Sequence, residues 1–473
     1  MTPLPDDAAT LATAPVVDPI SSGGAADRPG WRRDTSVFLA SQTISLFGSS
    51  LVQYAIMWHL TLQTKSGSVM ALAAVFGFLP QAVVSVFGGV WADRLNRKML
   101  IIGADAMIAT ATLALALAML AGASDLWLIY AALVVRSVGA GIQMPAVSAL
   151  LPQLVPTGKL MRVNSINTTI QSAMMLVAPA AAAAVYAGSS IIAVFFVDIV
   201  TAVIGIGLLS LIVVPRLVRH LGAGDEHSGY FDELLSGLRY AASHTFVRWV
   251  LALYAVVFVL IVAPSYLTPL MIVRTFGAEV WKLTANEIAF SIGMIIGGAL
   301  LAIWGGLKNR VTMMVASTVV FGGLSVGLGL STNLWVFFGF MFLVGIAVPF
   351  FSTTSMTVLQ ETVEPQMQGR VFGFIGIVAA VAMPVGMLVF GPLADRFTVE
   401  AVLVASGLVT FLVVAAAVAL PSGRQAMSAT HRHGGDPDSA AEDSVAQDSP
   451  VSDSPASGIA APDTMSSGSL AGR

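Results

Sequence analysis

Three ionisable side chains lie inside otherwise apolar stretches of the sequence. Arg136 stands near the middle of one stretch, and Asp105 and Asp198 stand near the start of two others. An unpaired charge in hydrocarbon costs at least ~2.5 kcal/mol on insertion scales, so each side chain must face the protein interior or water. Two interpretations are open for each residue: it takes part in proton coupling, or it forms a structural ion pair, a carbonyl contact or a helix cap.

A second group of candidates is polar but uncharged. Four residues recur along one apolar stretch at spacings near three and four, which places them on one face of a helix. Such a face can line a cavity in the middle of a helix bundle, and polar residues from two other stretches can join it. These cavity candidates are Gln42, Ser45, Ser49, Gln53, Gln143, Asn167 and Gln171. Hydrogen bonds between helices are the alternative explanation for Gln143 and Gln171.

One acidic residue near an apolar run has a purely structural explanation. Thr284 and Glu287 have the spacing of a capping box and stand just before that run. The pattern therefore predicts that Glu287 caps a helix N-terminus and has no part in a site.

The elements that must position these residues are membrane-spanning helices. The chain has 473 residues, of which 56% are hydrophobic and 10% charged, and its mean hydropathy is +0.84. Soluble chains carry about 25% charged residues, so a soluble globular domain is excluded. Twelve apolar segments are long enough to cross a ~30 Å hydrocarbon core. They run over residues 37–61, 69–91, 99–121, 126–147, 163–187, 191–214, 249–273, 286–307, 311–331, 334–358, 370–393 and 398–420. We therefore predict an all-α integral membrane protein.

Several chemistries have no residues to support them. The chain has no cysteine, its six histidines do not converge, and it contains no HExxH pair, so we expect no metal, no cofactor and no enzyme. A Gly-x-x-x-x-Gly-Lys-Ser/Thr string is absent, which excludes ATP hydrolysis through a P-loop. No basic run supports a nucleic-acid partner.

The distribution of Lys and Arg predicts the orientation. With the N-terminus inside, fifteen of these residues fall on the internal side and four on the external side, so both termini are expected in the cytoplasm and the chain in the cell membrane. The predicted organisation has five parts. These are a disordered N-terminal arm (1–36), a six-helix bundle (37–214), a central loop with a short amphipathic helix (215–248), a second six-helix bundle (249–420) and a disordered tail (421–473).

The two predicted bundles resemble each other in sequence. The pattern G-I-x-x-P-x-x-S occurs at 141–148 and again at 345–352. A tryptophan followed by Asn-Arg at five and six residues occurs at Trp91 and again at Trp304. Because both matches fall at equivalent positions of a six-plus-six layout, we interpret the chain as a duplicated transporter.

The string GGVWADRLNRK at 88–98 resembles the GxLADRxGRK signature of the major facilitator superfamily. Asn96 stands where that family usually has Gly, and a left-handed turn would explain the exchange. The resemblance implies a conformational latch that forms when the cavity faces outward. Its members would be Gly89, Asp93, Arg94 and Arg97. A positively charged turn with a surface ion pair is the alternative.

Other strings extend the resemblance. Arg136 with the glycines after it is similar to the family's fourth-helix motif, which implies a coupling role. Ala178 and Pro179 resemble the antiporter motif of the fifth helix with alanine in place of glycine, although an Ala-rich packing face gives the same string. The strings at 58–67, 151–156, 360–365 and 391–395 look like the macrolide-efflux and enterobactin-exporter branch.

This resemblance implies twelve helices in two six-helix halves and a secondary active exporter. The expected function is proton antiport of amphipathic small molecules of macrolide or multidrug type, by alternating access. The partners would be the small-molecule substrate, protons and the lipid bilayer, with the chain acting as a monomer. Export of an endogenous metabolite such as a siderophore, and proton-coupled import, remain alternatives.

Overall fold

The computed structural model describes residues 30–214, 238–307 and 309–420, apart from the side chains of Asp93, Thr157 and Gln366. The predicted tail, most of the predicted N-terminal arm and most of the central loop lie outside these residues. Of the central loop, residues 238–248 are described: 238–243 are helical, and the next helix begins at Thr245.

Twelve helices of the described chain are long and apolar enough to span a membrane, which confirms the predicted all-α fold. In the N-terminal half they are α1 (Trp31–Thr64), α2 (Gly67–Arg94), α3 (Arg97–Leu120), α4 (Leu126–Leu154), α5 (Leu160–Gly188) and α6 (Ile191–Ser210), with a short turn η2 (Thr157–Lys159) before α5. Helices suit this environment because hydrocarbon offers no water to backbone polar groups, and a helix satisfies them internally.

The C-terminal half contains six further spans. They are formed by α8 (Thr245–Tyr266) with α9 (Thr268–Met271) and η3 (Ile272–Phe276), then α10 (Val280–Trp304), α11 (Arg310–Leu330), α12 (Leu334–Thr362), α13 (Pro365–Arg396) and α14 (Val399–Ala419). The seventh span is broken after Tyr266, where Pro269 in the first turn of α9 has no N–H to continue the ladder.

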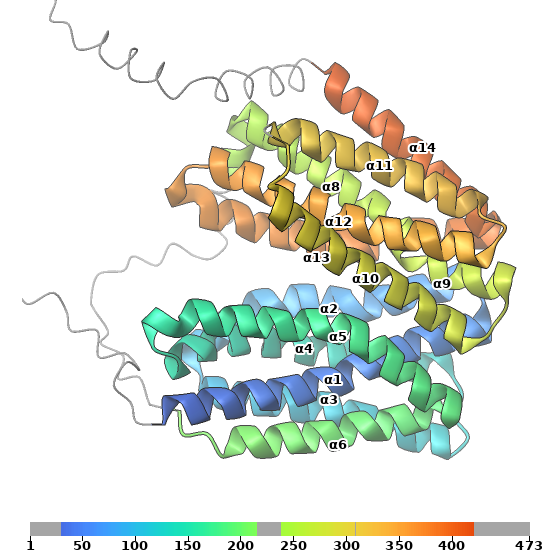
Figure 1. Cartoon of the computed structure of the whole chain (residues 1–473). Helices are drawn as coiled ribbons and strands as arrows, with labels where there is room; N and C mark the ends of the chain where they lie inside the picture. The colour runs from blue at the N-terminus through green and yellow to red at the C-terminus, as the bar shows by residue number, and fades with distance from the viewer. Residues whose placement is uncertain (1–29, 215–237, 308, 421–473) are drawn as a thin grey trace, which may run out of the picture.

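Helix packing is the same in both halves (Figure 1). In the first half α2 packs on α4, and α6 packs on α1 and α3. In the second half the equivalent helices repeat these pairs: α10 packs on α12, and α14 packs on α8 and α11. The halves meet chiefly through α2 against α13 and α5 against α10. This correspondence agrees with the duplication predicted from the sequence.

The repeated glycine pattern marks the tightest crossing in each half. A Cβ on Gly141 would lie 2.9 Å from the backbone oxygen of Gln81 on α2. A Cβ on Gly345 would lie 2.2 Å from the backbone oxygen of Phe290 on α10. Only glycine permits backbones to approach this closely, so the two patterns hold the same helix pair in each half.

The turn at Asn96 differs from the prediction. Its φ is −69°, so the backbone is not left-handed. Asn96 instead caps α3, accepting a hydrogen bond from the Met99 N–H at 3.3 Å. Asn309 caps α11 in the same way, through the Thr312 N–H at 3.0 Å. The repeated Asn-Arg dipeptide is therefore a helix N-cap signal, since a side-chain oxygen satisfies an N–H that the helix leaves unpaired.

Candidate functional site

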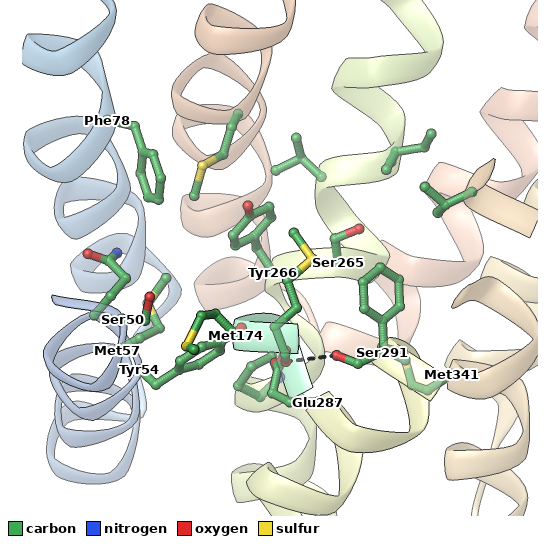
Figure 2. A pocket seen from close by; sticks show the side chains of 18 of the residues that line it. Ser50, Tyr54, Met57, Phe78, Met174, Ser265, Tyr266, Glu287, Ser291 and Met341 are labelled. Carbon is green, nitrogen blue, oxygen red and sulfur yellow. Dashed lines mark hydrogen bonds between the residues drawn. The ribbon is translucent and has the colours of Figure 1, made fainter. Parts of the chain in front are cut away.

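A cavity of about 590 Å³ lies between the two halves, a size suited to a drug-sized molecule. Both halves supply its walls, and Figure 2 shows many of the side chains. The N-terminal half contributes Leu46, Ser50, Gln53, Tyr54, Met57, Trp58, Phe78, Gln171, Met174 and Met175. The C-terminal half contributes Phe258, Ile261, Val262, Ser265, Tyr266, Pro269, Glu287, Phe290, Ser291, Met341, Val348, Phe351, Ser352, Ala379 and Met383.

The walls are aromatic, aliphatic and rich in methionine, with a few polar groups. Methionine is flexible and polarisable, so such walls can adapt to apolar ligands of different shape. Glu287 is the one residue among them that carries a full charge at neutral pH when ionised. The site can therefore hold an amphipathic molecule.

Two of the seven cavity candidates line this space. Gln53 and Gln171 are wall residues, whereas the other five are not among the lining residues. Ser45 and Gln143 instead donate hydrogen bonds to Asp105, and Ser49 donates one to Asp198 at 3.5 Å. The Gln42 amide nitrogen is buried without a hydrogen-bond partner among the described residues. The polar face of α1 thus serves carboxylates inside the N-terminal half as well as the cavity.

Arg136 and Asp198 form a buried ion pair between α4 and α6. Arg136 Nη1 lies 2.6 Å from Asp198 Oδ2, and the side chains are 8% and 1% exposed. Thr112 of α3 donates a hydrogen bond of 3.0 Å to the same carboxylate oxygen. Arg136 Nη2 also donates to the Ser49 carbonyl oxygen at 3.2 Å. The ion pair keeps both charges compensated inside the helix bundle, and the coupling role of the two residues stays a prediction.

Asp105 has a different environment. Its Oδ1 accepts hydrogen bonds from Ser45 Oγ at 2.8 Å and from Gln143 Nε2 at 2.6 Å. Its Oδ2 is buried and has no hydrogen-bond partner among the described residues. No basic side chain forms an ion pair with it in this part of the chain. A carboxyl group placed this way can hold a proton on Oδ2, since no fixed cation competes for the site.

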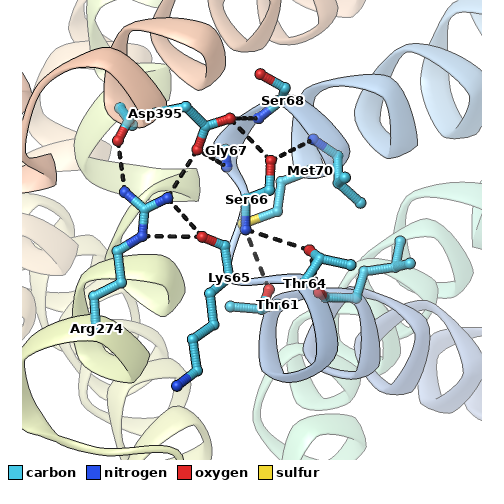
Figure 3. Close-up of polar contacts among 12 residues, drawn as sticks. Thr61, Thr64, Lys65, Ser66, Gly67, Ser68, Met70, Arg274 and Asp395 are labelled. Atoms are coloured by element: carbon cyan, nitrogen blue, oxygen red, sulfur yellow. Dashed lines mark hydrogen bonds and ion pairs between the residues drawn. The ribbon is translucent and has the colours of Figure 1, made fainter.

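A polar cluster joins the halves at one end of the bundle (Figure 3). We call it the Asp395 clamp; its members are Asp395, Arg274, Lys65, Ser66, Gly67 and Ser68. Asp395, at the end of α13, accepts hydrogen bonds from the N–H groups of Gly67 at 2.7 Å and Ser68 at 2.8 Å. It also accepts one from Ser66 Oγ at 2.9 Å. The carboxylate thus sits on the positive N-terminus of α2, where anions are stabilised.

Arg274 completes the clamp from η3. Its Nη2 lies 2.8 Å from Asp395 Oδ1, and its Nε donates to the Lys65 carbonyl oxygen at 3.0 Å. Its Nη1 donates to the Ala394 carbonyl oxygen at 2.5 Å. One guanidinium therefore binds both the loop between α1 and α2 and the end of α13, as a planar fork of five donors permits.

Glycines allow the two helices to meet beneath this cluster. A Cβ on Gly67 would lie 2.2 Å from the Gly391 carbonyl oxygen, and a Cβ on Gly391 would lie 2.5 Å from the Gly67 carbonyl oxygen. Neither backbone atom can move aside without separating α2 from α13. Close contact at this end therefore depends on both glycines.

The opposite end of the bundle lacks such a connection. Among the described residues, one further hydrogen bond joins the halves outside the clamp. Ser291 Oγ donates it to the Met175 carbonyl oxygen at 3.0 Å, beside the cavity. Within the described residues, the hydrogen bonds between the halves therefore lie at the clamp and beside the cavity, and none lies at the opposite end.

The residues of the predicted latch lie at that opposite end. Arg97 donates hydrogen bonds to the carbonyl oxygens of Ala92 at 2.8 Å and Ala149 at 2.7 Å, both in the N-terminal half. Arg94 is exposed, and a Cβ on Gly89 would meet nothing within 4 Å. The Asp93 side chain lies outside the described residues. The role of these residues as a latch therefore stays a prediction.

The remaining predicted residues are placed as follows. Ala178 and Pro179 are buried within α5, which continues as a helix on both sides of the proline. Asn167 is half-buried on the same helix. Their proposed contributions to packing and to the cavity stay predictions.

Two residues of the site were missed by the sequence argument. Glu287 is not a cap, because α10 begins at Val280 with Glu279 at its N-cap, so Glu287 lies two turns inside the helix. Asp395 could have been found, because the string G-x-x-A-D-R occurs at 89–94 and again at 391–396. The second copy ends α13 as the first ends α2.

Comparison with known proteins adds an independent observation. The model of the Major Facilitator Superfamily matches residues 38–310 and 280–442. The chain is 30% identical over 394 residues to macrolide efflux protein A of Streptococcus pyogenes, which covers 83% of this chain and 96% of the relative. A variant of the nucleoside transporter NupG superposes with a TM-score of 0.62 at 13% identity, covering 82% of this chain and 99% of that one. A bacterial homologue of the human lysosomal transporter Spinster gives 0.61 at 15% identity, covering 85% and 94%. At such identities the structural likeness concerns the fold.

Proposed function

Because the chain belongs to the Major Facilitator Superfamily, we propose that this membrane transporter is a secondary active exporter that exchanges amphipathic small molecules for protons across the cell membrane. The relative named for macrolide efflux covers most of the chain, which supports export and an amphipathic cargo. The observation that carries the proposal is the cavity between the halves, with adaptable apolar walls and, among the described residues, a clamp at one end and none at the other.

The direction of opening follows from the proposed orientation. Lys65, Arg274 and Arg396 lie at the clamped end, which the sparse Lys and Arg residues assign to the external side. The conformation is then closed to the outside and takes up cargo from the cytoplasmic side or the inner leaflet. Rocking of the two halves around the cavity would release the cargo outside, as alternating access requires.

Two similar strings supply the two closed states of this cycle. Asp395 at the end of α13 holds the start of α2. Because α2 and α13 run antiparallel, Asp93 at the end of α2 is positioned to hold the start of α13 when the external end opens. Each helix would then fasten the other at one side of the membrane.

The carboxyl group best suited to carry the exchanged proton is Asp105. Asp198 is neutralised by Arg136, whereas Asp105 has one buried oxygen without a partner and no paired cation among the described residues. Binding of a proton would favour one of the two conformations by its differential affinity for them.

Transport into energised inside-out vesicles tests this function. A panel of labelled compounds that includes a macrolide should accumulate when the vesicle lumen is acidic, and a protonophore should abolish the accumulation. Asp93→Asn should reduce accumulation without reducing the amount of folded transporter. Accumulation only in right-side-out vesicles would reverse the direction to import, and accumulation that ignores the protonophore would overturn proton coupling.

A further inference from the structure

We infer that the cavity selects amphipathic organic cations and that Glu287 is the residue that recognises their positive charge. The inference rests on the proposed function, since it names the class of cargo that the transport cavity holds. It concerns a protonated or quaternary amine attached to an apolar body.

The cavity wall contains one carboxyl group and no basic side chain. The lining residues include no Lys, Arg, His or Asp, so an ionised Glu287 gives the cavity a net negative charge. An anionic ligand would meet a repulsive group with no basic residue in the wall to offset it. The cavity is therefore matched to a cation in sign.

The carboxylate of Glu287 has no paired cation among the described residues. Glu287 is half-buried two turns inside α10, and within the described part of the chain it takes part in no ion pair. By contrast, Asp198 has Arg136 and Asp395 has Arg274. Asp105 also lacks a paired cation among the described residues, but it does not line the cavity. A carboxylate kept without a cation at this depth is costly, and a cationic ligand would compensate it.

The other side chains of the cavity wall are suited to an organic cation. Tyr54, Phe258, Tyr266 and Phe290 give the cavity aromatic walls, and Met57 and Met174 add polarisable thioethers. Figure 2 labels Tyr54, Tyr266 and both methionines. The face of an aromatic ring attracts organic cations, and it attracts them more strongly when water is excluded. The carboxylate and the aromatic rings together suit an organic cation with an apolar body. They do not suit a small hydrated ion.

Binding to the purified full-length transporter tests the inference without any transport step. The probes are tetraphenylphosphonium, a permanent monocation, and triphenylphosphine oxide, a neutral compound of related shape. Both are measured by equilibrium dialysis in detergent at one pH. We expect the wild type to bind the cation more tightly, and Glu287→Gln to weaken cation binding by about tenfold or more, as loss of one partner of a desolvated charge pair does. Binding of the neutral probe should change less than about twofold.

Two further variants separate recognition of charge from a role in folding. Glu287→Asp keeps the charge and should retain most of the preference for the cation. Glu279→Gln removes an exposed carboxylate from the start of the same helix and should change neither probe's affinity. Equal weakening of both probes by Glu287→Gln, or a wild type without preference for the cation, would overturn the inference. Neither outcome bears on whether the chain exports its cargo, which the vesicle experiment decides separately.

Discussion

The carboxylate of Asp395 accepts a hydrogen bond of 2.7 Å from the backbone N–H of Gly67, so the last turn of α13 holds the first turn of α2. The two residues stand 328 positions apart and belong to different halves of the molecule. This contact fastens the end of the bundle that we assign to the external side.

Removing the charge of Asp395 should shift the chain toward the conformation that is open at this end. Asn keeps one oxygen acceptor but loses the attraction to Arg274 and to the helix N-terminus. Because both partners of the ion pair are partly exposed, at 29% and 26%, we expect about 1–2 kcal/mol, or a five- to thirtyfold change in population.

Distances between spin labels at Ser124→Cys and Thr332→Cys measure that shift. Both sites are exposed in loops at the clamped end, one in each half, and the chain has no native cysteine to remove. Asp395→Asn should add a population at longer distance. Asp34→Asn, in the first turn of α1, serves as control and should leave the distribution unchanged. An unchanged distribution in Asp395→Asn would show that the clamp does not hold this end closed.

Gly67→Ala should open the same end by a steric route. Its Cβ would lie 2.2 Å from the Gly391 carbonyl oxygen, and overpacking of this kind costs about 1–3 kcal/mol. A cysteine placed at Ser265 in the cavity wall should then react faster with an impermeant maleimide added to right-side-out vesicles. Gly103→Ala adds a methyl group where nothing lies within 4 Å and should leave the rate unchanged. A slower reaction in Gly67→Ala would contradict the assigned closure.

Removing one partner of the ion pair between Arg136 and Asp198 should destabilise the protein more than removing both partners. Arg136→Leu leaves a buried carboxylate without its cation and should lower the free energy of unfolding by about 3–5 kcal/mol. The double variant with Asp198→Leu should be more stable than Arg136→Leu alone, since neither charge then remains. Thermal unfolding in detergent measures both, with the exposed Arg239→Leu as control. A double variant less stable than the single one would indicate that the pair contributes more than mutual compensation.

Asp105→Asn should abolish accumulation driven by the proton gradient but leave exchange of cargo across the membrane. The amide oxygen can still accept hydrogen bonds from Ser45 and Gln143, so the fold should persist, but the group no longer binds and releases a proton. We expect accumulation driven by the proton gradient to fall to the level seen with protonophore, while exchange of labelled for unlabelled cargo continues. Asp125→Asn, an exposed helix-start residue without a cap hydrogen bond, is the matched control. Gradient-driven accumulation that survives in Asp105→Asn would assign the proton to another group.

The helices could be predicted from the sequence because length and hydropathy determine membrane insertion one segment at a time. All twelve spans are present, and most predicted bounds differ from the observed ones by a few residues. The larger differences, of six or seven residues, come from helical turns outside the most apolar runs: α1 begins at Trp31, α4 ends at Leu154 and α10 begins at Val280. Polar and interrupted turns carry a weak hydropathy signal, so their helical state depends on neighbouring helices.

The partners of the polar residues could not be predicted in the same way. Arg136 and Asp198 were both identified as coupling candidates, but 62 residues separate them, and only the packing of α4 and α6 on α3 brings them together. Ser45 was assigned to the cavity because a helical face is visible in sequence, yet the helix against which that face packs is not. Glu287 was misplaced because α10 begins earlier than its most apolar run.

Most contacts of the Asp395 clamp are made to main-chain atoms. Asp395 binds two backbone N–H groups, and Arg274 binds the carbonyl oxygens of Lys65 and Ala394. The side chains at positions 65 and 68 are therefore less constrained than the acid, the guanidinium and the paired glycines. A lineage can alter the charge of the loops at the clamped end without changing the contacts that close this end, so divergence of these loops between related transporters carries little information about whether they operate alike.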